Sequence, residues 1–162
     1  MSDSSFTFRG QRPNERVENV IRRHPIVFCW PLLKATFALA IIAVVFVYFS
    51  LGTFFYLVAL VGGLYIFAEV FKIIFIYSNS FCLITNQRLI NIDQKGFFNR
   101  DISETDFFKI QDVTNKTSGF FGTTLNYGII TVQTAGTQNQ LVIKTIPDPY
   151  QIQQEITRNI RR

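Results

Sequence analysis

The sequence predicts a two-span transmembrane α-hairpin followed by a mainly-β, barrel-like domain with a C-terminal amphipathic helix. Three observations support this prediction. Residues 35–71 are almost continuously apolar, side chains after residue 79 mostly alternate between apolar and polar, and the last residues carry isoleucines spaced four apart. The chain of 162 residues is long enough for one such domain and a modest addition.

Changes in composition divide the chain into three parts. Residues 1–24 are polar, and we expect a partly flexible N-terminal segment on the cytoplasmic side. Residues 25–78 form the membrane region. Residues 79–162 form the folded domain, which we also expect in the cytoplasm.

The membrane region contains two segments that are long enough to cross a bilayer. A hydrocarbon core of about 30 Å takes about 20 apolar helical residues, and the two segments cover roughly residues 32–49 and 54–72. Only a short, uncharged stretch around Gly52 separates them, so the two helices must be antiparallel neighbours. The small residues Gly62 and Gly63 would let the helix backbones approach closely.

Basic residues set the predicted orientation. Residues 1–34 carry six Lys and Arg against three Asp and Glu, Lys72 follows the second span, and the turn has no basic residue. The positive-inside rule therefore places both termini in the cytoplasm. We expect a multi-pass protein of the cell (inner) membrane.

Glu69 is the one acidic side chain within the predicted spans. A carboxylate inside a membrane indicates by default a functional site, such as a step in a proton relay. The alternative is structural, because Glu69 lies one helical turn before Lys72 and can pair with it at the membrane interface. We favour the structural interpretation, since the spans contain no second acidic residue or histidine to continue a relay.

The domain after the membrane region has the alternation of β-strands. Ile90 and Ile92 share one face of a predicted strand, Gln94 to Gly96 form a turn, and Ile130 and Val132 point inward from a later strand. The strands are predicted at residues 81–85, 88–93, 97–102, 107–113, 128–134 and 140–146.

The C-terminal residues predict an amphipathic helix. Asp148 is a good N-cap, Pro149 suits the first helical position, and Gln151 has the spacing of a capping box. The helix would cover the open end of the sheet with one apolar stripe. That stripe consists of Ile152, Ile156 and Ile160.

The order of short motifs resembles the bacterial pleckstrin-homology (PH) family of small membrane proteins. The motifs are RRHP at 22–25, LITNQRLI at 83–90, KGFFNR at 95–100, KIQDV at 109–113, LNYGIITVQTAG at 125–136 and IPDP at 146–149. The resemblance runs from Arg22 to the C-terminus and implies a PH-like barrel. It departs at Phe120 and Phe121, where the family often has a Leu-Leu-Gly-type stretch. It implies little biochemistry, because a fold does not settle a function.

The sequence offers no chemistry typical of an enzyme, and we expect none. His24 is the only histidine and lies at the predicted membrane edge, while Cys29 and Cys82 form no C-x-x-C pair. We therefore predict no catalytic, cofactor-binding or metal-binding residues. We also expect no nucleic-acid partner, because the basic surplus precedes the spans instead of forming a dense basic face.

Three non-enzymatic functions remain. The leading interpretation is an adaptor or accessory subunit of a membrane protein assembly, whose PH-like domain binds a protein partner or further copies of the chain. The second is recognition of anionic lipid headgroups in the membrane. The third is a component of an oligomeric transporter or channel, which only Glu69 supports. The candidate headgroup contacts are Arg22, Arg23, Lys34, Lys72 and Arg88.

Overall fold

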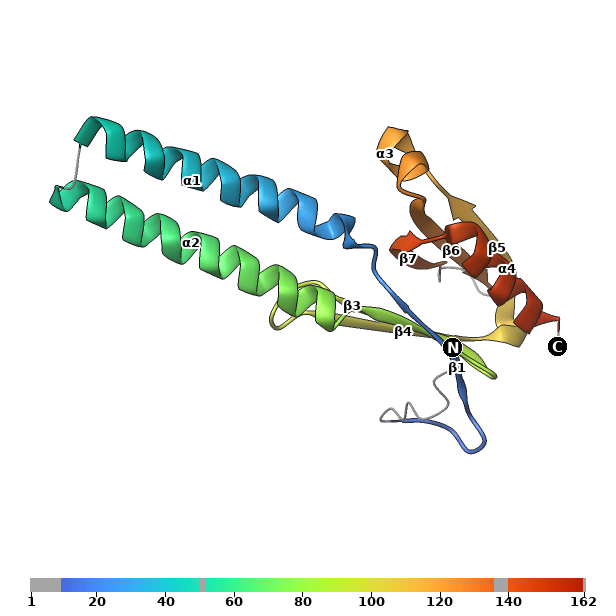
Figure 1. Ribbon diagram of the computed structural model, residues 1–162. Coiled ribbons are helices and arrows are strands. Elements are labelled where there is room, and N and C mark those ends of the chain that lie inside the picture. The colour runs from blue at the N-terminus through green and yellow to red at the C-terminus, as the bar shows by residue number, and fades with distance from the viewer. Residues whose placement is uncertain (1–9, 50–51, 136–139, 162) are drawn as a thin grey trace. The chain divides into compact units, whose positions relative to one another are not determined.

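The computed structural model describes residues 10–49, 52–135 and 140–161, and Figure 1 shows its elements. The chain forms two compact units. Residues Pro25–Ser78 form the first, which we call the helical hairpin. Residues up to His24 join Asn79–Arg162 in the second, which we call the sheet domain. Residues 1–9 of the predicted N-terminal segment lie outside the described part of the chain.

The helical hairpin contains the two predicted long helices. A short 3-10 turn, η1 (Pro25–Phe28), leads into α1 (Cys29–Phe49), and α2 (Thr53–Ser78) follows. The second helix is longer than predicted, because the residues after Lys72 remain apolar and contain no helix breaker.

Both helices are long and apolar enough to cross a membrane, at Pro25–Tyr48 and Thr53–Ser78. A core helix of a soluble domain would be mostly buried, but only 6% of the first span and 0% of the second are buried within the described chain. The two helices therefore present their apolar side chains outward, as helices in a lipid environment do.

The two predicted small residues lie differently in the helical hairpin. A Cβ atom placed on Gly62 would come within 2.7 Å of the Ile42 Cδ1 atom, so α1 approaches α2 closely at this point. A Cβ atom on Gly63 would meet nothing within 4 Å. Of these two glycines, Gly62 is thus the one at which an added side chain would displace the Ile42 side chain of the other helix.

The sheet domain begins with a strand in the N-terminal segment. Strand β1 (Val17–Arg22) pairs antiparallel with β2 (Phe81–Thr85), and Arg22 lies opposite Phe81. The prediction of a polar, partly flexible segment did not include this strand. The helical hairpin is therefore inserted between two neighbouring strands of one sheet. The chain leaves and re-enters the sheet domain at the end marked by Arg22 and Phe81, which we call the helix-linked end.

The strands form two separate antiparallel sheets. The first has the order β1-β2-β3-β4, and the second has the order β5-β6-β7. A 3-10 turn, η2, joins the sheets, and the short helix α3 connects β5 to β6. These elements are β3 (Arg88–Gln94), β4 (Arg100–Asp106), η2 (Phe107–Lys109), β5 (Ile110–Lys116), α3 (Gly119–Thr124), β6 (Tyr127–Thr134) and β7 (Gln140–Pro147).

The predicted barrel is not closed, and two of its strands begin later than predicted. The amides of Lys95 and Gly96 donate to the Asn99 carbonyl at 2.9 and 3.3 Å, so residues 95–99 form a turn. Phe97 and Phe98, predicted at the start of a strand, lie in this turn. Residues 107–109 likewise form a 3-10 turn instead of the start of β5.

The main core lies between the two sheets and the C-terminal helix α4 (Pro149–Ile160). Ile130 and Val132 are fully buried as predicted. Ile152 and Ile156 of α4 are also in this core, and Ile160 packs against it, which confirms the predicted stripe. A smaller cluster on the other face of the first sheet contains Val17, Leu83, Ile90 and Ile92.

The predicted capping box at the start of α4 is not formed. Asp148 is the N-cap, but its backbone is left-handed, with φ at 44°, and its side chain caps no helix amide. The Asn126 side chain instead donates a hydrogen bond to the Asp148 carboxylate. The Asp148 amide also donates to the Asn126 carbonyl at 3.0 Å, so the loop before β6 holds the start of α4.

Candidate functional site

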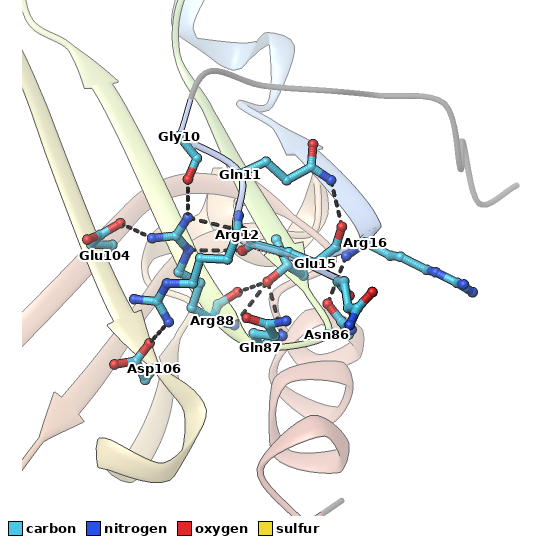
Figure 2. Close-up of polar contacts among 12 residues, drawn as sticks. Gly10, Gln11, Arg12, Glu15, Arg16, Asn86, Gln87, Arg88, Glu104 and Asp106 are labelled. Atoms are coloured by element: carbon cyan, nitrogen blue, oxygen red, sulfur yellow. Dashed lines mark hydrogen bonds and ion pairs between the residues drawn. The ribbon is translucent and has the colours of Figure 1, made fainter.

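A buried ion pair links the N-terminal segment to the first sheet (Figure 2). The Arg88 Nε and Nη2 atoms donate to the two carboxylate oxygens of Glu15 at 2.9 and 3.1 Å. The Nη1 atom donates to Glu104 at 2.7 Å, and Nη2 also donates to the Gly10 carbonyl at 2.9 Å. Side-chain exposure is 7% for Arg88 and 0% for Glu15, so this pair is removed from water.

The T-N-Q-R motif forms the turn that places Arg88. The Thr85 hydroxyl accepts hydrogen bonds from the amides of Gln87 and Arg88 at 3.1 and 2.9 Å, and it donates to the Arg88 carbonyl. The Asn86 side chain accepts from the Arg16 amide at 2.8 Å and donates to the Asn14 carbonyl at 3.0 Å. The motif therefore clamps the segment before β1 onto the turn between β2 and β3.

The electrostatics of the pair keep both groups charged. Burial disfavours the ionised form of Glu15, but hydrogen bonds from Arg88 and from the Arg12 amide outweigh it and lower the pKa of Glu15. The hydrogen bond to Glu15 raises the pKa of Arg88 despite the opposing effect of burial. Loss of either partner would leave a buried charge without its main counter-charge.

A second ion cluster lies beside the first. The Arg12 Nη1 atom donates to the Asp106 carboxylate at 2.7 Å, and the Lys109 ammonium lies 3.4 Å from the other Asp106 oxygen. The hydrogen bond from Arg12 is the main cause that lowers the pKa of Asp106. The two clusters together tie the N-terminal segment to β4 and η2.

The lowered pKa values predict a loss of stability in acid. A carboxyl group whose pKa is lower in the folded state adds stability above its ordinary pKa, and this stability is lost as the pH falls through the folded pKa. The sheet domain should therefore lose stability as the pH falls below the ordinary Glu value of 4.5. Acid titration of the full chain in detergent, followed by hydrogen exchange at β2 and β3, measures this. The Glu15→Gln protein should start less stable and show a flatter profile; an unchanged profile would contradict the assignment.

A cleft of about 620 Å³ lies beside β4, the last strand of the first sheet. Residues 102–106 of β4 line it together with Arg12 and Lys109, and Gln140 and Leu141 of β7 lie on the other side. Among the described residues, β4 pairs with β3 alone and β7 pairs with β6 alone. The cleft thus lies between two sheet edges that a closed barrel would have joined.

The predicted headgroup contacts are distributed over both units of the chain. Arg22 is exposed at the end of β1, and Arg23 forms an ion pair with Asp93. Both arginines line one small pocket with Lys144, a basic residue that is not among the predicted headgroup contacts. Lys34 and Lys72 lie on the helical hairpin, where Lys72 is exposed.

Arg88 differs from the other four candidates. Its guanidinium is buried against Glu15 and Glu104, and it lies opposite Asp106, at the end of the first sheet away from Arg22. We therefore remove Arg88 from the candidate headgroup contacts. No local pattern around Arg88 indicates this burial, because Glu15 lies far from Arg88 along the chain.

Glu69 also pairs with a different residue from the predicted Lys72. The Glu69 carboxylate lies 3.9 Å from the ammonium of Lys34, on the other helix. Antiparallel packing brings the start of α1 beside the later part of α2, so a partner across the hairpin is available as well as one along α2. The structural interpretation, in which Glu69 belongs to an ion pair and not to a proton relay, thus depends on Lys34.

The described residues contain no group of three or more His, Cys, Asp or Glu side chains placed to hold a metal ion. Cys82 is buried, and burial raises the pKa of its thiol to about 12, so it stays protonated at neutral pH. Cys29 is exposed. His24 stacks on Tyr127 with ring centroids 5.4 Å apart, and its amide donates to the Thr145 carbonyl at 2.7 Å.

Comparison with known proteins identifies a family. The profile of the family described as bacterial PH domain matches residues 32–160. No curated protein matches the chain. A DUF1696 family protein with a pleckstrin-homology domain from Shewanella loihica PV-4 is 22% identical, with a TM-score of 0.40 over 50% of this chain and 70% of that one. A pleckstrin homology domain from Shewanella amazonensis SB2B is also 22% identical, with a TM-score of 0.41 over 50% and 66%. The family match covers most of the chain, and this protein therefore belongs to the bacterial PH domain family.

Proposed function

We propose that this protein is a non-enzymatic integral membrane protein that presents a PH-like interaction domain at the cytoplasmic face of the cell membrane. It acts as an adaptor or accessory subunit of a membrane protein assembly. The helical hairpin is the anchor, and the cleft beside β4 binds an extended segment of a protein partner. The single observation that carries this proposal is the open edge of β4 along that cleft.

An open strand edge is suited to an extended peptide. The outer backbone groups of β4 can pair with an added strand, whose main-chain hydrogen bonds supply affinity while its side chains supply specificity. The cleft also offers one apolar contact among polar ones, because the Ile102 side chain is 59% exposed there. A small apolar ligand would find too few apolar side chains in this lining.

The ion clusters hold the cleft in one shape before a partner binds. Asp106 is fixed by Arg12 and Lys109, and Glu104 is fixed by Arg88. A surface that is ordered in advance loses less conformational entropy on binding. The charges on β4 also discourage random pairing between sheet edges, which favours a partner with matching charges.

The orientation of the anchor is supported by its flanking charges. Basic residues precede α1 and Lys72 lies in the later part of α2, while residues 50–53 contain no charged side chain. Such a pattern favours a cytoplasmic location for both termini and for the sheet domain.

A photo-crosslinking experiment tests the partner surface. A photoreactive amino acid replaces Ser103, on β4 in the cleft, in the full chain in its native membrane. Ile102→Lys should reduce the crosslinked partner by about tenfold, which corresponds to a lost contact of about 1.4 kcal/mol. The matched control is Val142→Lys, an exposed apolar residue of β7 outside the cleft lining, which should leave the crosslink unchanged.

Two results would count against the cleft. A photoreactive amino acid in place of Gln154, an exposed residue of α4, could capture the same partner equally well. Alternatively, the crosslink from Ser103 could be insensitive to Ile102→Lys. Either result would mean that the partner, if any, binds elsewhere.

A further inference from the structure

Connectivity alone determines which turns of the first sheet share the helix-linked end. Strand β1 ends at Arg22, three residues before Pro25, and β2 begins at Phe81, three residues after Ser78. Phe81 lies opposite Ile92, so the end of β3 and the start of β4 are at this same end. The turn at residues 95–99 therefore lies at the helix-linked end of the first sheet.

The second sheet places α3 at the same end. His24 directly precedes the helical hairpin, and it contacts Tyr127 and Thr145 of the second sheet. Tyr127 is the first residue of β6, and α3 lies just before it in the chain. The turn at 95–99 and α3 are thus two projections from the helix-linked end.

Both projections carry phenylalanine pairs that face solvent. Phe98 is 99% exposed in the turn, and Phe120 and Phe121 of α3 are 79% and 65% exposed. Phe97 is more covered, at 43%. Exposed apolar groups that cluster at one end of a domain indicate a surface that meets a protein or a membrane.

The same end carries basic side chains that have no ion pair among the described residues. Arg22 ends β1, Arg100 begins β4, Lys116 ends β5, and Lys144 lies on β7 in the pocket with Arg22. All four are exposed. Arginines and lysines beside exposed aromatic rings are the combination that binds an anionic membrane surface.

We infer that the turn at residues 95–99 and helix α3 insert their phenylalanines into the membrane interface, while the neighbouring basic residues bind anionic lipid headgroups. The occupant is the membrane surface because the hairpin that starts at this end is itself the proposed membrane anchor. The inference rests on that proposed anchor and is independent of the β4 cleft. It extends the sequence-based lipid hypothesis from Arg22 and Arg23 to two aromatic projections.

An exposed phenylalanine at the other end of the sheet domain provides a matched control. Phe108 is 81% exposed in η2, next to the turn between β2 and β3. This turn is opposite to the helix-linked end, because Arg88 pairs with Asp106 there. Phe108 therefore matches the projecting phenylalanines in exposure but should stay in water.

Fluorescence quenching by lipids in proteoliposomes tests the inference on the full chain. The native protein has one tryptophan, Trp30, at the start of α1, and it reports on the anchor. In a Trp30→Phe background, the proteins with Phe98→Trp, Phe121→Trp and Phe108→Trp each carry one probe. The vesicles contain phosphatidylcholine with or without phosphatidylglycerol, and a lipid brominated near the headgroup is the quencher.

We expect the Phe98→Trp and Phe121→Trp proteins to lose most of their emission and to shift to the blue in vesicles with phosphatidylglycerol. The Phe108→Trp protein should emit as it does without brominated lipid. Arg100→Gln with Lys116→Gln should reduce quenching of the Phe98→Trp protein in the anionic vesicles.

The possible failures are distinguishable. Quenched Trp30 with unquenched tryptophans at 98 and 121 would overturn the inference while the anchor stands, and would point to a protein as the occupant. Unquenched Trp30 would overturn the anchor and the inference together. Equal quenching at 98, 121 and 108 would also contradict the inference, because it would show unspecific adsorption.

Discussion

Replacing Glu15 with alanine is expected to destabilise the sheet domain by about 3–5 kcal/mol, which is the usual cost of removing one partner of a buried ion pair. The charge of Arg88, whose side chain is 7% exposed, would lose its buried counter-charge and keep weaker interactions such as those with Glu104 and the Gly10 carbonyl. The change would also release the segment before β1. Hydrogen exchange of β1, β2 and β3 in the detergent-solubilised full chain should therefore become much faster.

A matched control distinguishes the effect of removing a buried ion pair from the effect of removing a charge at the surface. Lys95 and Asp101 also form an ion pair, at 2.5 Å, but their side chains are 60% and 56% exposed. Asp101→Ala should leave exchange in the first sheet unchanged, because exposed pairs contribute little. Glu15→Leu combined with Arg88→Met should recover much of the lost stability, since apolar groups of similar volume replace a buried pair well. Hydrogen-exchange rates in the Glu15→Ala protein that equal those of the wild type would refute the stabilising role of this pair.

Gly62→Leu is expected to separate the two helices at their close approach and to cost about 1–3 kcal/mol, the usual range for overpacking. Even a Cβ atom at this position would lie 2.7 Å from the Ile42 side chain. Spin labels at Leu39 and Leu64, which are both exposed, should report a longer and broader distance between α1 and α2.

Gly63→Leu is the natural control for this effect. It adds the same side chain at the next position of α2, where a Cβ atom meets nothing within 4 Å. The distance between the labels should then match that of the wild type. If both leucine variants behaved alike, the packing of the hairpin would not depend on Gly62.

Patterns that are local in the sequence predicted their elements well. Continuous apolar residues indicated α1 and α2, and the alternation around Ile130 and Val132 indicated β6 with both side chains inward. The isoleucine stripe likewise predicted which face of α4 is buried. Each pattern lies within one element and reports on its own burial.

Features that join distant parts of the chain were not predictable in this way. Strand β1 is short, and its partner β2 follows the whole helical hairpin. The contact between Glu15 and Arg88 joins equally distant parts of the chain, so local patterns do not show that the guanidinium of Arg88 is buried. Glu69 was paired with Lys72 because local spacing shows only neighbours on the same helix, whereas Lys34 lies across the hairpin.

The turn at residues 95–99 and helix α3 show a third reason why sequence-based prediction was incomplete. Phe97 and Phe98 do not belong to the strand predicted at residues 97–102, because β4 begins at Arg100. The turn is closed instead by backbone hydrogen bonds from Lys95 and Gly96 to Asn99. That the phenylalanines of this turn and of α3 share one end of the domain follows only from strand pairing and connectivity.

The most direct test of the account is the membrane topology of the full chain. In a Cys29→Ser, Cys82→Ala background, single cysteines replace Gly52, between the two helices, and Gln154, on the exposed face of α4. We predict that an impermeant maleimide labels the Gly52→Cys protein in intact cells and labels the Gln154→Cys protein only after permeabilisation. Labelling of the Gln154→Cys protein but not the Gly52→Cys protein in intact cells would reverse the orientation. Equal labelling of both in intact cells, or of neither until permeabilisation, would show that the hairpin does not cross the membrane.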